Sequence, residues 1–177
     1  MKHFLHYVEN AIKKNWERPG ISNYGAKTYT CGEIAANVLK MHILFEKMGI
    51  KPGDHVAIAA RNSAEWCIAF LAITSYKAVA VPLLPDFLPE NLVQLTKLSG
   101  SRMLFVDKNI LAGFKRDNLL NSFDNVKDFI GIFDIVAYAT VDECEHNVKV
   151  LADELDILYK EKYPDGIDKS HVDYSGN

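Results

Sequence analysis

Short apolar runs alternate with helical segments from residue 55 to residue 106, and this alternation constrains the fold more than any other feature. The apolar runs cover residues 55–60, 78–81 and 103–106, and apolar residues recur at helical spacing over 63–76 and 89–98. A strand that is apolar at every position is covered on both faces, and strands joined through a helix run parallel in one sheet. The sequence therefore predicts an α/β fold with a mostly parallel sheet flanked by helices.

Residue pairs at the helix starts indicate where two of these helices begin. Thr30 and Glu33 have the spacing of a capping box, in which each side chain hydrogen-bonds the backbone N–H of the other residue. Asn62 and Glu65 repeat this spacing, so we expect Asn62 to cap the helix over 63–76. That helix is apolar almost all round, which predicts deep burial for the helix and for the strand that follows it.

The N-terminal part gives a simpler pattern. Residues 1–26 predict a helix over 4–16, closed by a Pro-Gly pair, and then one strand of a small hairpin. The hairpin would pair residues 20–24 with residues 27–29.

The central α/β subdomain is expected over residues 27–140. Its last part is less regular, because 109–123 is mixed helix or loop and 129–136 is one further apolar strand. Residues 141–177 predict an amphipathic helix over about 148–159, followed by a linker that runs to the last residue.

The composition excludes one large class of function. Apolar residues make up 49% and charged residues 24% of the chain, as in ordinary globular proteins. Residues 141–177 contain ten acidic residues against four lysines, within a net charge of −3. This acidic end would repel phosphate backbones, so we expect no nucleic-acid partner.

No segment is typical of a membrane or secreted protein. The most apolar stretch, 66–84, is interrupted by a lysine and a proline, whereas a membrane span needs roughly 20 mainly apolar residues. The N-terminus lacks the apolar core of a signal peptide. Cys31, Cys67 and Cys144 lie far apart, which indicates reduced thiols in a cytoplasmic protein.

Glycine patterns that cradle phosphates are absent. The sequence contains neither Gly-x-Gly-x-x-Gly nor Gly-x-x-x-x-Gly-Lys-Ser/Thr. The nearest cluster, Ser-Gly-Ser at 99–101, has no following lysine and is better explained as a helix stop. Ser63 has no Gly-x-Ser-x-Gly surroundings, so we expect it to cap a helix and not to act as a nucleophile.

The histidines offer no stronger site. His3 and His6 share one helical face, but no third metal ligand is near them in sequence. His42 and His55 are expected at the edges of packed elements.

The acidic C-terminal part offers no stronger candidate for a functional site either. Cys144 and His146 are expected in a surface loop, and the carboxylates Asp153, Glu154 and Asp156 on the solvated face of the last helix. From the residues alone, we assign no catalytic, cofactor-binding or metal-binding residue.

Four sequence blocks in a fixed order resemble the opening region of the adenylate-forming enzymes, which include acyl-CoA synthetases, luciferases and peptide-synthetase adenylation domains. The blocks are KTYTCGEI at 27–34, MGIKPGDHVAI at 48–58, RNSAEW at 61–66 and YKAVAVPL at 76–83. The resemblance continues to Asp107 and implies a partial N-terminal subdomain of the adenylate-forming synthetase fold. Its Asn-x-x-Glu-Trp and Met-Leu-Phe-Val-Asp motifs are most similar to long-chain fatty acyl-CoA synthetases.

Two positions depart from the family's pattern. Val79 replaces the usual glycine, and Leu88 stands where Ser or Thr commonly caps a helix. Loss of that cap costs about 1 kcal/mol, so Asp86 is expected to cap the helix instead. In the family, a Ser/Thr/Gly-rich phosphate loop with a lysine follows the region that matches 126–174, and the adenosine-binding acids and catalytic lysine lie further on.

The resemblance implies a two-step reaction for the parent enzyme. A fatty acid or another carboxylate attacks the α-phosphate of ATP with Mg²⁺ present, and CoA then displaces AMP to give a thioester. ATP, Mg²⁺ and CoA are implied for the parent, and no cofactor is expected to bind this chain alone. Because the phosphate loop is missing, we expect the chain by itself to be inactive. Apolar faces left uncovered would favour self-association.

Two other classes of function compete with this interpretation. The chain could be a stand-alone, non-catalytic α/β module that binds a protein or a small ligand. A dinucleotide-binding oxidoreductase domain is disfavoured, because its glycine fingerprint is absent. The coding sequence after Asn177 discriminates the synthetase from the module.

Overall fold

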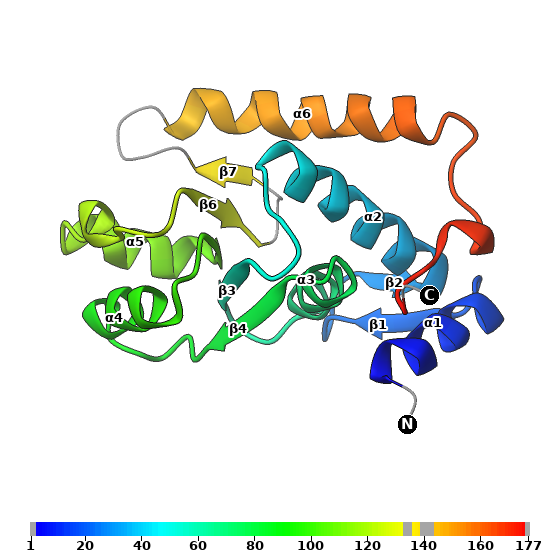
Figure 1. Ribbon diagram of the computed structural model, residues 1–177, viewed down its shortest axis with the longest axis horizontal. Helices are drawn as coiled ribbons and strands as arrows, with labels where there is room; N and C mark the ends of the chain where they lie inside the picture. Colours follow the sequence, from blue (N-terminus) through cyan, green and yellow to red (C-terminus); the bar gives the residue numbers. More distant parts are fainter. Residues whose placement is uncertain (1–2, 133–135, 139–143, 176–177) are drawn as a thin grey trace.

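A five-stranded sheet forms the centre of the computed structural model, which describes residues 3–132, 136–138 and 144–175 (Figure 1). The strand order is β4-β3-β5-β6-β7, and every neighbouring pair is parallel except β6 and β7. The strands are β3 (His55–Ala59), β4 (Val79–Leu83), β5 (Met103–Val106), β6 (Asp128–Gly131) and β7 (Val136–Tyr138). The α/β fold with a mostly parallel sheet is therefore confirmed.

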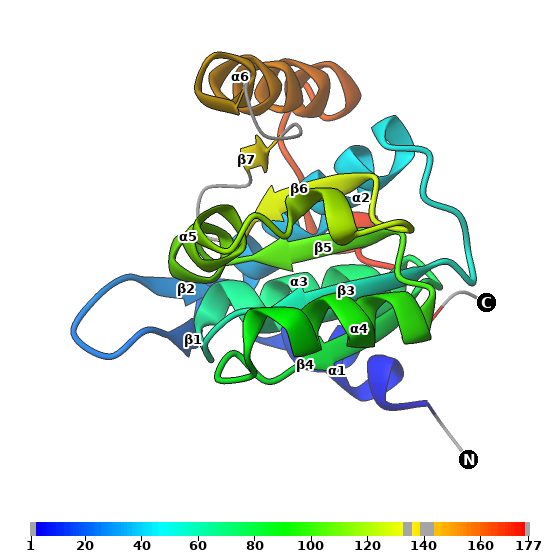
Figure 2. The ribbon, with the colours of Figure 1, turned by 90° about the vertical axis from the view of Figure 1, so that its left-hand side faces the viewer.

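Helices cover both faces of this sheet. The helices are α1 (Phe4–Lys14), α2 (Cys31–Lys47), α3 (Ala64–Ser75), α4 (Pro89–Ser99), α5 (Lys108–Arg116) and α6 (Cys144–Lys162). Successive residues of a strand face opposite sides: in β5, Phe105 joins the core under α2 and α3, whereas Leu104 joins the core under α4 and α5. Figure 2 shows the sheet between these two pairs of helices.

The hairpin, the start of α2 and the end of α4 agree with the predictions from the sequence. β1 (Pro19–Ser22) pairs antiparallel with β2 (Thr28–Thr30). The Thr30–Glu33 capping box is present, because Glu33 N donates to Thr30 Oγ1 at 3.1 Å and Thr30 N donates to Glu33 Oε2 at 2.8 Å. Gly100 ends α4 with a φ of 64°, which confirms the helix stop at 99–101.

At the start of α3, the expected capping by Ser63 is confirmed and the expected capping by Asn62 is wrong. Ser63, not Asn62, is the cap, since Trp66 N donates to Ser63 Oγ at 3.0 Å. Glu65 is occupied elsewhere: its carboxylate accepts from Tyr29 Oη at 2.7 Å and from Asn23 Nδ2 at 2.9 Å. This carboxylate therefore joins the hairpin to the first turn of α3.

The expected burial of α3 and β4 holds only in part. β3 and β5 are central, but β4 is the edge of the sheet among the described strands, and Val79 is 41% exposed. Pro82, which cannot donate to a sheet, is tolerated at such an edge. Trp66 and Phe70 of α3 stack on one another at 5.5 Å and are half-buried.

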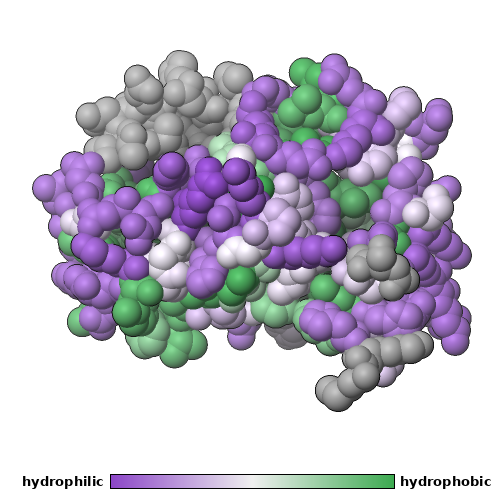
Figure 3. Space-filling view, in the orientation of Figure 1, coloured by the Kyte–Doolittle hydropathy of each residue, from purple (hydrophilic) through white to green (hydrophobic). Residues whose placement is uncertain are grey.

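Hydrophobic surface gathers near this edge. Figure 3 shows hydrophobic atoms over α4 and the segment before it, where the exposed large apolar side chains are Leu84, Phe87, Leu88 and Leu98. Leu88 precedes α4 without any side-chain cap, so the expected capping by Asp86 is wrong. Self-association stays a prediction, and this patch is where we expect it.

The C-terminal part differs most from expectation. Of the predicted strand over 129–136, residues 129–131 belong to β6 and residue 136 begins β7, while residues 133–135 lie outside the described residues. The predicted loop at Cys144 and His146 is the first turn of α6. The segment after α6 is not a linker, because Val172 and Tyr174 are 1% and 3% exposed. Figure 1 shows α6 beside β7 and α2, and the segment after α6, as far as it is described, returning to α1. Val172 and Tyr174 have polar neighbours in the sequence, so no apolar pattern indicated that their side chains are buried.

The region expected to be irregular, 109–123, contains α5 and a short 3-10 helix, Leu120–Ser122. A second 3-10 helix, Lys169–His171, lies in the C-terminal segment. Across the residues that the structure describes, no helix combines the length and the apolar character needed to cross a membrane.

Candidate functional site

The carboxyl ends of β3 and β5 form the place where a ligand site is expected in this topology. From β3 the chain crosses through α3 to β4 on one side, and from β5 it continues through α5 to β6 on the other side. The helices α3 and α5 lie on opposite faces of the sheet. Such a change of direction opens a crevice between neighbouring strands, where open parallel sheets bind ligands.

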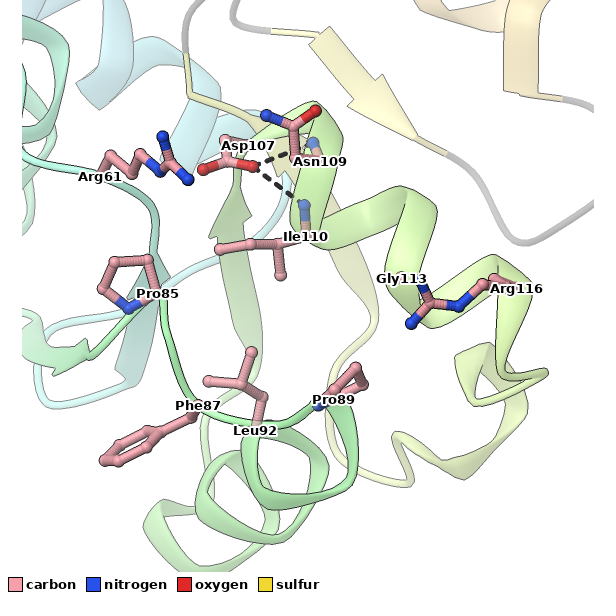
Figure 4. A pocket seen from close by; sticks show the side chains of 10 residues that line it. All are labelled: Arg61, Pro85, Phe87, Pro89, Leu92, Asp107, Asn109, Ile110, Gly113 and Arg116. Carbon is pink, nitrogen blue, oxygen red and sulfur yellow. Dashed lines mark hydrogen bonds between the residues drawn. The ribbon is translucent and has the colours of Figure 1, made fainter.

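A pocket of about 230 Å³ lies at this point and is called the switch-point crevice below (Figure 4). Arg61 enters it just after β3, and Asp107 directly after β5. The remaining lining residues come from the β4–α4 connection and from α4 and α5: Pro85, Phe87, Pro89, Leu92, Asn109, Ile110, Gly113 and Arg116. The crevice therefore has an apolar wall and charged groups at its ends.

Asp107 is a buried, hydrogen-bonded polar group of the crevice. The residue is 5% exposed, and its Oδ1 accepts from the backbone N–H groups of Asn109 and Ile110, both at 2.9 Å. These bonds cap α5. Figure 4 shows the guanidinium of Arg61 pointing toward the other carboxylate oxygen. Asp107 thus fixes the start of α5 and presents one oxygen to the crevice.

The charged groups of the crevice suit binding better than catalysis. Arg116, at the far end, already donates to the carboxylate of Asp117 at 2.8 Å and 3.0 Å, and this pair raises the pKa of Arg116 and lowers that of Asp117. No nucleophile with an adjacent base lines the crevice. In the described part of the chain, no three His, Cys, Asp or Glu side chains meet as metal ligands.

The histidines considered from the sequence have structural contacts. His3 Nδ1 accepts from Leu5 N at 3.4 Å at the start of α1, and His6 bonds Asn10 at 3.0 Å. His55 Nδ1 donates to Ser99 O at 2.5 Å and so joins β3 to the end of α4.

His42 joins two helices. Its Nε2 lies 3.1 Å from Ala72 O and 3.0 Å from Ser75 Oγ, which ties α2 to α3. Burial lowers the pKa of His42 to about 4, despite the hydrogen bond to Ala72, so the ring is neutral at neutral pH. Ser75 Oγ itself donates to Leu71 O at 2.6 Å, which leaves it a poor nucleophile.

The carboxylates of α6 are not simply a solvated face. Glu154 accepts from Lys47 at 2.6 Å, and Asp156 pairs with Lys40. Both lysines belong to α2, so these carboxylates attach α6 to α2. Asp153 is exposed, as expected.

No sequence pattern indicated that one pocket is lined by Arg61, Asp107, Asn109 and Arg116. The first two could have been found, because each follows a buried parallel strand, and carboxyl ends of adjacent parallel strands meet at one edge. Asn109 and Arg116 depend on how α5 is oriented, which the sequence does not give.

Comparison with known proteins identifies the family. A model of the AMP-binding enzyme family matches residues 8–166. The chain belongs to this family. The four blocks that resembled adenylate-forming enzymes all lie within the matched residues, so that resemblance is confirmed.

The curated relatives of this AMP-binding family chain are much longer proteins. 4-Coumarate–CoA ligase CCL1 of Humulus lupulus is 26% identical over 169 residues, which are 91% of this chain and 29% of that protein. Oxalate–CoA ligase of Arabidopsis thaliana is 30% identical over 57% of this chain, which is 20% of the length of that protein. Surfactin synthase subunit 2 of Bacillus subtilis is 26% identical over 58% of this chain, which is 3% of the length of that protein. The chain spans less than a third of each.

Solved structures agree on the fold. The anthranilate CoA ligase AuaEII, in complex with anthranoyl-AMP, matches with a TM-score of 0.66 at 15% identity, over 72% of this chain and 24% of that chain. The Mycobacterium tuberculosis fatty acyl CoA synthetase matches with a TM-score of 0.62 at 19% identity, over 72% and 26%. At these identities the likeness shows the fold alone, and it covers part of the larger fold.

Proposed function

We propose that the chain forms the N-terminal part of an ATP-dependent acyl-CoA synthetase. The family match over residues 8–166 carries this proposal, and the relatives named as CoA ligases support it. The whole enzyme would join a carboxylate to the α-phosphate of ATP with release of pyrophosphate. The thiol of CoA would then attack the acyl carbon and expel AMP.

A fatty acid is the carboxylate we propose for the whole enzyme. The motifs at 62–66 and 103–107, which resemble those of long-chain fatty acyl-CoA synthetases, support this choice. The curated relatives include enzymes named for other acids, 4-coumarate and oxalate, so the fatty acid is the finer part of the proposal.

The chain alone would serve as a scaffold without the chemistry. Its sequence has no glycine-rich phosphate loop, and its described residues do not fit a metal site. We therefore derive no step through ATP or Mg²⁺ within this chain. Its contribution would be a folded sheet with the switch-point crevice, against which the phosphate-binding part of the enzyme would pack.

Exchange of labelled pyrophosphate into ATP tests the proposal. A polypeptide that includes the coding sequence following residue 177 should catalyse exchange that depends on a carboxylate, and decanoate should support it better than 4-coumarate or oxalate. Better exchange with 4-coumarate would contradict the fatty-acid part. No exchange with any carboxylate would contradict the synthetase proposal and favour a stand-alone binding module.

A further inference from the structure

A second and larger cavity lies at the opposite end of the molecule from the switch-point crevice. Its volume is about 440 Å³. It is a surface hollow lined by α1, the α1–β1 connection, β1, the start of α2 and one residue of α3, and is called the α1 groove below. Figure 1 shows α1 and the hairpin at the end of the molecule away from α4 and α5. The two cavities share no lining residue.

The walls of the α1 groove are mainly apolar. Aliphatic side chains from three helices and one strand line it: Val8, Ile12, Ile21, Ile34 and Leu71. Gly20 lets β1 lie directly on α2, because a Cβ there would be 2.6 Å from Ile34 Cδ1 and 3.2 Å from Cys31 Sγ. On α1, the exposed residue Ala11 contributes only a methyl group. The small residues on two sides leave the hollow open.

One charged residue lies among those that line the α1 groove. This residue, Arg18, is exposed, and its guanidinium makes no ion pair or hydrogen bond with any residue that the structure describes. The neighbouring amide of Asn15 donates to Ala11 O at 2.9 Å and is already satisfied. A long arginine side chain can cover apolar surface while its charged end stays at the water boundary. Arg18 therefore provides a free cation at the rim.

We propose that the α1 groove binds an amphipathic anion, an alkyl chain that ends in one carboxylate. The chain would lie against the aliphatic walls, and the carboxylate would accept hydrogen bonds from Arg18. Binding sites for small molecules enclose about 300–1,000 Å³ and combine apolar walls with a few polar groups, as this groove does. Arginine favours carboxylates because its N–H groups match both oxygens. This site is separate from the switch-point crevice and does not depend on the proposed synthetase function.

Isothermal titration calorimetry with three probes measures separately what the alkyl chain and the carboxylate contribute to the affinity. Decanoate carries both parts, decan-1-ol carries the chain with an uncharged hydroxyl head, and acetate carries the head alone. The 177-residue chain should bind one decanoate, bind decan-1-ol about tenfold more weakly, and show no binding of acetate. Equal affinity for decanoate and decan-1-ol would overturn the role of Arg18. No binding of decanoate would overturn the site.

Variants with matched controls locate the binding. Arg18→Gln should weaken decanoate about tenfold and leave decan-1-ol unchanged, whereas Arg61→Gln in the switch-point crevice should change neither. Ala11→Phe should fill the groove and abolish binding of both, and Ala112→Phe, at an exposed alanine of α5, should not. Unchanged thermal unfolding of each variant shows that it folds. Binding that survives Ala11→Phe would overturn the proposal.

The thiol of Cys31 reports on the same groove. It lines the cavity and is 8% exposed, whereas Cys67 lies outside it and is half-buried. Decanoate should slow the reaction of Cys31 with a small alkylating reagent, while Cys67 reacts as before, as followed by mass spectrometry of each peptide. If protection of Cys31 without decanoate rises with protein concentration in step with a dimer seen by sedimentation, a second copy fills the groove, and the proposal is overturned.

Discussion

Different contacts stabilise two regions of the molecule. One region is the sheet core under α2 and α3, and the other is the C-terminal segment of residues 153–175, called the strap below. In the core, Phe45, Ile58 and Phe105 are completely buried. In the strap, the buried side chains among the described residues are Leu155, Val172 and Tyr174. Partly buried apolar side chains of the strap also pack against the core: Leu158, Tyr159, Tyr163 and Ile167. The strap adds partly exposed charge pairs of α6 with Lys40, Lys47 and Glu46 of α2.

This difference indicates how the stability of each region should respond to substitutions, salt and pH. Burial of apolar surface does not depend on charge and is not screened by salt, and its loss lowers the stability of the whole domain. Partly exposed charge pairs contribute little and are screened by salt. We therefore expect the core to unfold as one unit, and the strap to open locally at a smaller free energy.

The largest expected effect is in the core. Phe105→Ala should lower the free energy of unfolding by about 3–5 kcal/mol, because it removes a fully buried ring that lies 6.1 Å from the ring of Phe45. Urea denaturation followed by circular dichroism measures it. The control is Leu98→Ala at an 85% exposed position, which should change the value by less than about 0.5 kcal/mol. Equal effects would contradict the assignment of the core.

The next effect should appear where the strap meets α1. Glu9 Oε2 accepts from Tyr174 N at 3.1 Å, from Ser175 N at 3.2 Å and from Ser175 Oγ at 2.9 Å. Glu9→Ala should make opening of the strap easier by about 2 kcal/mol, since hydrogen bonds to a charged group are lost. Hydrogen exchange of the Tyr174 amide measures this, with Glu17→Ala as control at an exposed acid of the same region. Unchanged protection in the Glu9 variant would sink the prediction.

Acid should release the same contact. Burial alone would raise the pKa of Glu9, but hydrogen bonds from Lys13, Ser175 and Tyr174 outweigh it and lower the pKa from 4.5 to about 2. The folded-state pKa is lowered, so this stabilisation is complete above pH 4.5 and is lost as the pH falls toward 2. The amide resonances of Tyr174 and Ser175 should shift over this range and should not shift in the Glu9→Ala variant. A transition centred near neutral pH would contradict the contact.

The smallest effect is expected for single charge pairs between α2 and α6. Lys47→Ala should lower the free energy of unfolding by about 0.5 kcal/mol, because the side chains of Lys47 and Glu154 are 31% and 45% exposed. Thermal unfolding at low and at high salt should show the difference only at low salt. Lys51→Ala, at an exposed lysine outside these pairs, is the control. A loss as large as that of Phe105→Ala would show that the strap belongs to the core.

The sequence predicted the core better than the strap for a physical reason. The helix starts and the apolar runs of β3 and β5 are local signals, and Thr30 with Glu33 is a contact between near neighbours. Whether an apolar run lies in the middle or at the edge of a sheet depends on strand order, so β4 looked the same as β5 in sequence. The strap depends on contacts such as Glu9 with Tyr174, which are far apart along the chain.

The crevice was predictable only in part. Arg61 and Asp107 follow two parallel strands, and the change of direction between those strands follows from the strand order. Asn62 was expected to cap α3 because its spacing to Glu65 imitates a capping box. The carboxylate of Glu65 instead bonds the hairpin, which no local pattern indicates.

One measurement tests most directly whether this member of the AMP-binding family is a scaffold that lacks the chemistry. The purified 177-residue chain is incubated with ATP, Mg²⁺, labelled pyrophosphate and decanoate, and the label in ATP is counted against a reaction without protein. We expect the same count with and without the chain. Label in ATP that depends on both the chain and the carboxylate would contradict it, because the activating groups would then lie within these residues.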